Sequence, residues 1–119
     1  MKEPDARNLR ARTKAFALRI IRLYSSLPKT TEAQVLGKQV LRSGTSVGVH
    51  YREAIRARSA AEFIKIEVGL QELEETVYWL ELLVEASLVN ESKLCDLLRE
   101  AEELTAIFVS SAKTAKKSR

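Results

Sequence analysis

The sequence has very few of the residues on which disulfides, bound metals and histidine chemistry depend. It contains one cysteine, Cys95, and one histidine, His50, so a single chain can form neither a disulfide nor a thiol-rich metal site. A di-iron centre in a four-helix bundle needs two Glu-x-x-His motifs, and here His50 precedes Glu53 in the reverse order. No apolar run approaches the roughly 18 residues of a membrane span. We therefore expect no metal, no cofactor and no membrane contact, a cytoplasmic location, and Cys95 buried among its neighbouring leucines.

Glycine and proline are also scarce, with four and two residues in 119, which favours helices. Apolar residues recur at alternating spacings of three and four, and Pro28 and Asn90 interrupt the pattern. The expected helices are 5–27 with Asp5 as its cap, 31–58 starting in a capping box at Thr31, 59–87 and 90–112. Short connections make sequential helices antiparallel neighbours. The predicted fold is an all-α, up-down-up-down four-helix bundle formed by residues 1–112, followed by a basic, flexible tail at 113–119.

Three glycines, Gly37, Gly44 and Gly48, lie inside the second predicted helix, and the last two are four residues apart among small polar residues. Glycine in a helix interior costs about 1 kcal/mol relative to alanine. We therefore expect another backbone to approach closely at this point, or the helix to bend there.

The two halves of the chain have opposite charge. Residues 1–58 hold 13 lysines and arginines against four acids, whereas residues 59–112 hold three against 12. The first two helices should therefore present a basic surface and the last two an acidic one. A basic surface suits phosphate groups, although it can also steer protein partners.

The third predicted helix carries more apolar residues than one core-facing stripe requires. Ile64, Val68, Trp79 and Leu82 project away from that stripe when successive residues are turned by 100°. On the first helix, Leu18 and Ile21 show a weaker excess of the same kind. Single exposed apolar residues are common on monomers, but a tryptophan in such a stripe favours a buried contact. These six residues are the predicted interface of a homo-oligomer.

The stretch Gly44–Phe63, GTSVGVHYREAIRARSAAEF, and the later segment 72–83, ELEETVYWLELL, resemble the bacterial four-helix bundle proteins encoded within 23S rRNA intervening sequences. The resemblance covers roughly residues 14–110. Many members of that family have Ala-Asn before Tyr-Arg-Glu-Ala, whereas this chain has Val49-His50, so the role of that position is open.

The resemblance implies a ring-like homo-pentamer. It also implies a relation to accessory proteins of diversity-generating retroelements, in which similar basic pentamers contact a reverse transcriptase and RNA. No known reaction comes with it. The resemblance supports nucleic-acid-binding roles for Arg42, Arg52, Arg56 and Arg58, and the charge of the first two helices adds Arg7, Arg10, Lys14, Arg19, Arg22 and Lys38.

Three functions remain open at this point. The first is an oligomer that binds nucleic acid, RNA in preference to DNA, with weak sequence specificity because few aromatic residues are present for stacking. The second is a protein scaffold that docks a partner such as a reverse transcriptase. An enzyme is the least favoured, since no nucleophile has a predictable general base. For Arg52 and Glu53, a structural role is favoured as much as a binding role: the two residues would form a partly buried ion pair that fixes the second helix to its neighbours.

Overall fold

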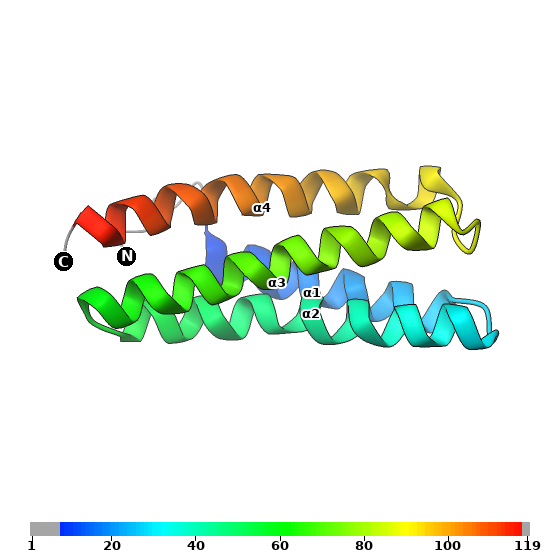
Figure 1. The fold of residues 1–119 in the computed structure, drawn as a ribbon, viewed down its shortest axis with the longest axis horizontal. Helices are drawn as coiled ribbons and strands as arrows, with labels where there is room; N and C mark the ends of the chain where they lie inside the picture. Colours follow the sequence, from blue (N-terminus) through cyan, green and yellow to red (C-terminus); the bar gives the residue numbers. More distant parts are fainter. Residues whose placement is uncertain (1–7, 118–119) are drawn as a thin grey trace.

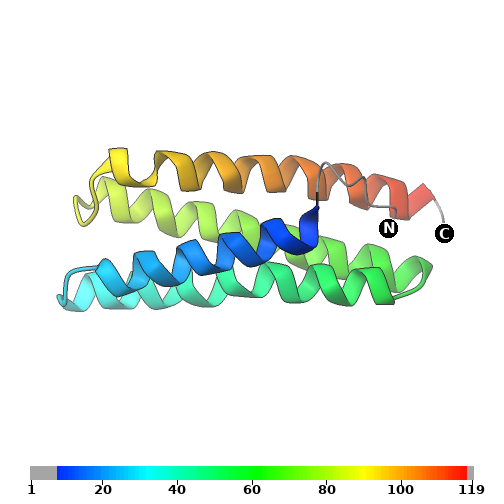
Figure 2. The same cartoon turned by 180° about the vertical axis from the view of Figure 1, so that it is seen from behind.

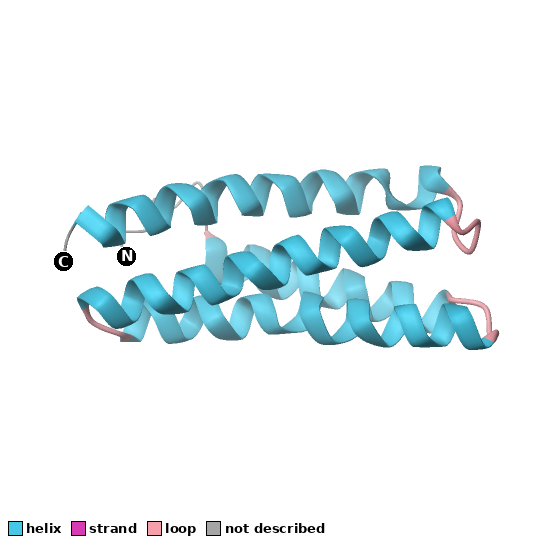
Figure 3. Cartoon of the chain, viewed as in Figure 1, coloured by secondary structure: helices cyan, strands magenta, loops and turns pink. Residues whose placement is uncertain are grey.

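The chain folds as four helices that run alternately up and down (Figures 1 and 3). The computed structural model describes residues 8–117, and the helices are α1 (Leu9–Ser26), α2 (Thr31–Arg56), α3 (Ser59–Glu85) and α4 (Glu91–Lys117). The bundle measures 47 × 24 × 19 Å. The prediction of an all-α, antiparallel four-helix bundle is confirmed.

The helix starts differ in detail from the predicted ones. The cap of α1 is Asn8, whose side chain accepts a hydrogen bond from the Ala11 backbone N–H. Asp5, the expected cap, lies outside the described residues. The cap of α2 is Thr30, one residue before the expected Thr31. In both cases the side-chain oxygen of the cap accepts a hydrogen bond from a backbone N–H of the first turn that has no partner within the helix.

The last helix is longer than expected. Instead of ending at residue 112, α4 continues to Lys117. Ala112 and Ala115 are both buried in this last part, so the apolar face of the helix extends into the segment that was predicted to be a flexible tail. For residues 113–117 that prediction is wrong, because buried alanines hold the last turn of α4 on the bundle.

The core lies along the axis of the bundle and is filled by large apolar side chains. Phe16 and Ile20 of α1, Leu73 and Leu80 of α3 and Phe108 of α4 are each no more than 1% exposed. Fully burying a side chain of this size contributes roughly 1.5–3 kcal/mol. Packing of these faces, more than intrinsic helix propensity, therefore holds the four helices together.

Glycines allow α1 and α2 to approach closely. A Cβ atom placed on Gly44 would lie 2.7 Å from Cγ1 of Ile20, and one placed on Gly48 would lie 3.1 Å from Oγ1 of Thr13. Both distances are shorter than ordinary van der Waals contact. The expected close approach at the two glycines is confirmed, and the element that approaches is α1.

The helix α1 lies against α2 along its length but makes far fewer contacts with α4. It has 18 residues, whereas α3 and α4 have 27 each, so at 1.5 Å per residue it is about 13 Å shorter. Figure 2 shows α1 lying over α2. The seam between α1 and α4 is therefore the least closely packed of the four.

Candidate nucleic-acid interface

The structure places the predicted basic residues on two different faces. Arg7 lies outside the described residues. On the outer side of α1 and α2, and at the α2–α3 connection, lie Arg10, Lys14, Lys38, Arg42, Arg52, Arg56 and Arg58, of which only Arg52 is partly buried. Arg19 and Arg22 instead line a cleft between α1 and α4. The sequence could not separate these two groups, because the separation depends on which neighbour each face of α1 meets.

A shallow groove runs between α1 and α2 on the first of these faces. It has a volume of about 220 Å³, and both Lys14 of α1 and Arg52 of α2 line it. Gly48 also lines the groove, and its missing side chain allows the two helices to lie close enough to bring both cations to one groove. The groove is the best-defined feature of the basic outer face, which we define as Arg10, Lys14, Lys38, Arg52 and Arg56.

The cations of the basic outer face have no carboxylate partner. Among residues 8–117, none of the five lies within 4.0 Å of an acidic oxygen in an ion pair. The chain keeps its acids mainly on α3 and α4, and the acids there that form ion pairs with α1 and α2 pair with Arg12, Arg42 and His50 instead. Unpaired arginine and lysine side chains on one surface raise the local concentration of polyanions.

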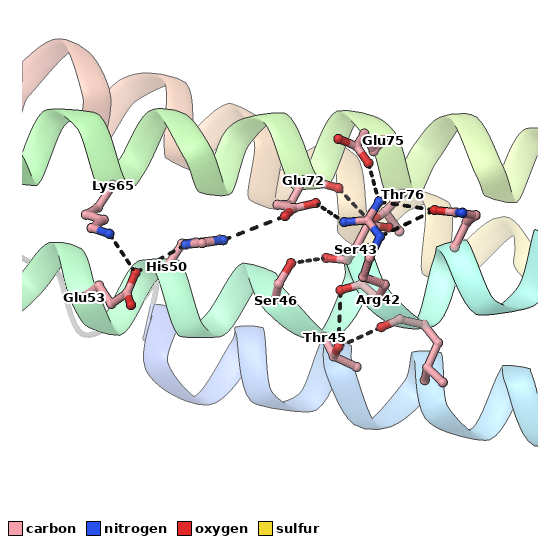
Figure 4. A network of polar contacts seen from close by, with 12 residues as sticks. Arg42, Ser43, Thr45, Ser46, His50, Glu53, Lys65, Glu72, Glu75 and Thr76 are labelled. Carbon is pink, nitrogen blue, oxygen red and sulfur yellow. Dashed lines mark hydrogen bonds and ion pairs between the residues drawn. The ribbon is translucent and has the colours of Figure 1, made fainter.

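Arg42 is engaged within the chain, in contrast to these five. The Nη2 atom of Arg42 lies 2.6 Å from Oε1 of Glu75, and its Nη1 atom lies 3.4 Å from Oε1 of Glu72; both glutamates are on α3 (Figure 4). The hydrogen bond with Glu75, followed by the nearby charge of Glu72, raises the pKa of Arg42 above its ordinary value. A polyanion would have to displace two carboxylates here, so Arg42 is the weakest member of the predicted set.

A second polar cluster links α2 to α3 near His50 (Figure 4). Nδ1 of His50 lies 3.3 Å from Oε1 of Glu53, which also lies 3.3 Å from Nζ of Lys65 on α3. The Lys65 hydrogen bond, with that of His50, lowers the pKa of the exposed Glu53 carboxyl. The alternative role of Arg52 and Glu53 as an ion pair does not hold, because Glu53 pairs with His50 and with Lys65 of α3, whereas Arg52 lines the groove with α1.

Arg12 is a structurally important residue that the sequence reasoning missed. Its Nη2 atom lies 2.6 Å from Oε1 of Glu100 and 2.9 Å from Oε1 of Glu103, and its Nε donates to Oε2 of Glu100 at 3.0 Å. These hydrogen bonds raise the pKa of Arg12. The signal was available in principle, since α1 and α4 are antiparallel neighbours and the start of α1 lies beside the middle of the longer α4.

The predicted oligomer residues are not equally accessible. Leu18 and Ile21 on α1 and Ile64 on α3 are exposed, with 45, 43 and 57% of their surface accessible. Val68 and Leu82 are half-buried. An interface role for these five residues stays a prediction, and the three exposed ones offer the most surface for it.

Trp79 is largely covered by its own chain. Its side chain packs against the core, and its indole Nε1 is buried with no hydrogen-bond acceptor among the described residues. Tyr78, which the sequence reasoning did not select, is 54% exposed, and its ring meets that of Trp79 edge-on at 5.1 Å. Tyr78 continues the alternating three-and-four spacing of Ile64 and Leu82, and this spacing could have identified it.

Several other expectations can be compared with the described part of the chain. No group of three or more His, Cys, Asp or Glu residues could hold a metal ion there. No helix within residues 8–117 is long and apolar enough to cross a membrane. Cys95 is exposed rather than buried, because the apolar face of α4 turns Leu94 and Leu97 inward and leaves Cys95 outside.

Comparisons with known proteins agree with this architecture. Residues 7–110 match the family described as 23S rRNA-intervening sequence protein. The chain belongs to this family. It is also similar to the crystal structure of a protein of unknown function from the S23 ribosomal protein family of Bacteroides thetaiotaomicron, with 35% identity and a TM-score of 0.82 over 87% of this chain and 97% of that one. A comparison with curated proteins gave no match.

Proposed function

We propose that this member of the 23S rRNA-intervening sequence protein family is a cytoplasmic, non-enzymatic homo-oligomer that binds nucleic acid, RNA in preference to DNA. The basic outer face of α1 and α2 is the binding surface. The observation that carries the proposal is the groove lined by Lys14 and Arg52, on a face whose cations lack carboxylate partners within residues 8–117.

Binding on this surface would be mainly electrostatic. Lysine and arginine side chains that contact phosphates release counterions, and the affinity then falls steeply as salt rises. The groove offers no aromatic ring for stacking a base among its lining residues. We therefore expect little sequence specificity, since phosphate contacts carry no direct sequence information.

Assembly would multiply this surface. A pentameric ring, which the family resemblance favours, presents five copies of the basic outer face, and binding at several copies increases the overall affinity without any new kind of contact. Exposed Leu18, Ile21 and Ile64, with Tyr78, supply apolar surface for contacts between subunits. Apolar side chains of this size are typical of the centre of an oligomer interface.

The experiment is a fluorescence anisotropy titration of a labelled, structured RNA at several salt concentrations. We compare the unmodified protein with the double variant Lys14→Glu and Arg52→Glu, and the matched control is Arg99→Glu with Lys116→Glu, two exposed cations of α4. Each phosphate contact contributes roughly 0.7–0.9 to the slope of log affinity against log salt. The groove variant should lose at least about one unit of slope, whereas the control should lose much less.

Two results would refute the nucleic-acid proposal. One is the absence of RNA binding by the unmodified protein even at low salt. The other is an equal loss of affinity in the groove variant and in the control, which would show that net charge matters and the groove does not. Molar mass by light scattering, measured with and without RNA, tests the assembly independently.

A protein scaffold is the second candidate, and the exposed apolar side chains of α3 favour it. Ile64 and Tyr78 are each more than half exposed, on a helix outside the basic outer face. In this role the partner would be a protein such as a reverse transcriptase encoded in the same genome. Binding of that enzyme after nuclease treatment, and its loss in Tyr78→Glu, would favour the scaffold, whereas binding that depends on added RNA would not.

A further inference from the structure

The end of the bundle that carries the α1–α2 and α3–α4 connections contains a cleft. The cleft lies between the last turns of α1 and the first turns of α4 and has a volume of about 450 Å³. In this bundle the glycines of α2 allow α1 to lie close to α2, whereas α1 and α4 make few contacts. Both connections lie at this end in Figure 1. The volume is within the range of about 300–1,000 Å³ found for small-ligand pockets.

The lining of the cleft combines apolar and positively charged side chains. Leu94 and Leu97, which are buried, contribute apolar surface from α4. Arg19 and Arg22 of α1 and Lys93 of α4 contribute three positive charges, and no aspartate or glutamate of the described chain lines the cleft. A ligand that matches this lining has an anionic group beside a small apolar or planar group.

The register of α1 against α4 places two cations at a level of this seam where an ion pair could have formed. Arg12 meets Glu100 across the same seam. Arg19 lies seven residues after Arg12 on α1, and Lys93 lies seven residues before Glu100 on the antiparallel α4. The two cations therefore occupy corresponding positions, and both line the cleft. An opposite-charge pair is thus replaced by two like charges. Facing like charges are unfavourable in the empty bundle, and an anion between them removes the repulsion.

The nearest acids in sequence do not neutralise this group. Asp96 is directed to Arg99 of its own helix, with Oδ1 3.2 Å from Nη1. Glu91 is exposed and does not line the cleft. The positive end of the α4 dipole also lies here, because α4 begins at Glu91, and it favours negative charge at the same end of the bundle.

We propose that the cleft is a binding site for a phosphate monoester attached to a nucleoside-sized group. Arg19, Arg22 and Lys93 bind the phosphate, and the leucine side chains contact the attached group. A free nucleoside monophosphate and the phosphorylated end of a nucleic-acid strand share this chemistry. The site is separate from the basic outer face, so it does not require the RNA-binding function proposed above.

Isothermal titration calorimetry with adenosine 5′-monophosphate, adenosine and inorganic phosphate tests the site. We expect the monophosphate to bind the unmodified protein and adenosine to bind at least about tenfold more weakly, since charged hydrogen bonds to phosphate account for most of the affinity. Arg19→Gln should weaken binding by about tenfold or more. The matched control, Lys14→Gln on the basic outer face, should bind like the unmodified protein.

Lys93→Glu separates a binding defect from a folding defect. This change places a carboxylate opposite Arg19 and recreates the charge pairing of Arg12 with Glu100. The variant should therefore lose the monophosphate while its melting temperature stays equal or rises by about 2–4 °C. Retained binding in Lys93→Glu, equal affinities for adenosine and its monophosphate, or equal losses in Arg19→Gln and Lys14→Gln would each overturn the proposal.

Short RNA oligonucleotides with a 5′-phosphate or a 5′-hydroxyl identify the source of the phosphate. Stronger binding of the phosphorylated oligonucleotide than of the monophosphate supports a strand end, and the reverse order supports a free nucleotide. The variant Lys14→Glu with Arg52→Glu keeps this test distinct from the RNA proposal. It should lose structured RNA and keep the monophosphate, so either proposal can fail alone.

Discussion

The buried pair Ser43 and Thr76 allows a quantitative test of how α2 and α3 are joined. Both residues are fully buried, and their hydroxyl oxygens lie 2.7 Å apart (Figure 4). Thr76 donates its proton to the backbone carbonyl of Glu72 at 2.7 Å, so Ser43 must be the donor between the two hydroxyls. The alternative acceptor for Ser43, the carbonyl of Val40, lies at 3.5 Å, which is too long for a good hydrogen bond.

The two single variants are therefore unequal. Thr76→Val keeps the side-chain shape but leaves the Ser43 hydroxyl buried without a good acceptor, which should lower the free energy of unfolding by about 1–3 kcal/mol. Ser43→Ala removes one hydrogen bond and leaves Thr76 bonded to its carbonyl, so the loss should be about 0.5–1.5 kcal/mol. In the double variant no polar group remains unpaired, and its stability should lie within about 1 kcal/mol of the original.

Urea unfolding, followed by circular dichroism at one fixed protein concentration, measures all four proteins. The fixed concentration is needed because assembly would make the apparent stability depend on it. The expected coupling energy between the two sites is about 1 kcal/mol or more, with the double variant more stable than the sum of the single effects predicts. Additive losses would show that the hydroxyls act independently and would refute the hydrogen bond between them, whereas a larger loss in Ser43→Ala than in Thr76→Val would refute the donor assignment.

Three further predictions concern the seams between the helices. Gly44→Ala should lower the free energy of unfolding by about 1–2 kcal/mol, because overpacking outweighs the gain in helix propensity, whereas Gly48→Ala should change it by less than about 1 kcal/mol in the same urea assay. Arg12→Gln should cost about 1–2 kcal/mol, discounted for partial exposure, and should speed hydrogen exchange in α1 more than in α3. The hydrogen bond from Lys65 lowers the pKa of Glu53 in the folded protein below its ordinary 4.5. The ionised Glu53 therefore stabilises the folded state above the unfolded pKa, and this contribution is lost as pH falls through the folded pKa. The melting temperatures of the original and of Glu53→Gln should differ at neutral pH and converge in acid, and a constant difference would contradict this.

The fold could be predicted because its determinants are local in the sequence. Leu9, Phe16 and Ile20 repeat on one face of the first helix, and Pro28 ends that helix region. Gly44 was correctly interpreted as a point of close approach, since the cost of a glycine in a helix needs a structural reason. The end of α4 was misplaced because the buried alanines that extend it are small and carry little periodic signal.

The candidate sites were harder to predict, because they depend on neighbours that the sequence does not specify. Arg12, Arg19 and Lys14 look alike on α1, yet the first is bound by carboxylates, the second lines a cleft and the third lines the groove with α2. Trp79 was selected as an exposed apolar residue. The 100° rule correctly set it away from the centre of the core stripe, but the side chain packs against the core and its indole nitrogen is buried.

The loose seam between α1 and α4 has a consequence for how the chain opens and closes. The helix α1 packs mostly on α2 and α4 packs mostly on α3, whereas few contacts join α1 to α4. Segments with fewer buried contacts open at lower free energy than the rest of a structure. We therefore expect this seam to open before the contacts between sequential helices are lost, and to close last during folding. A chain opened in this way would expose the core-facing sides of α1 and α4, and it could exchange a pair of helices with another copy.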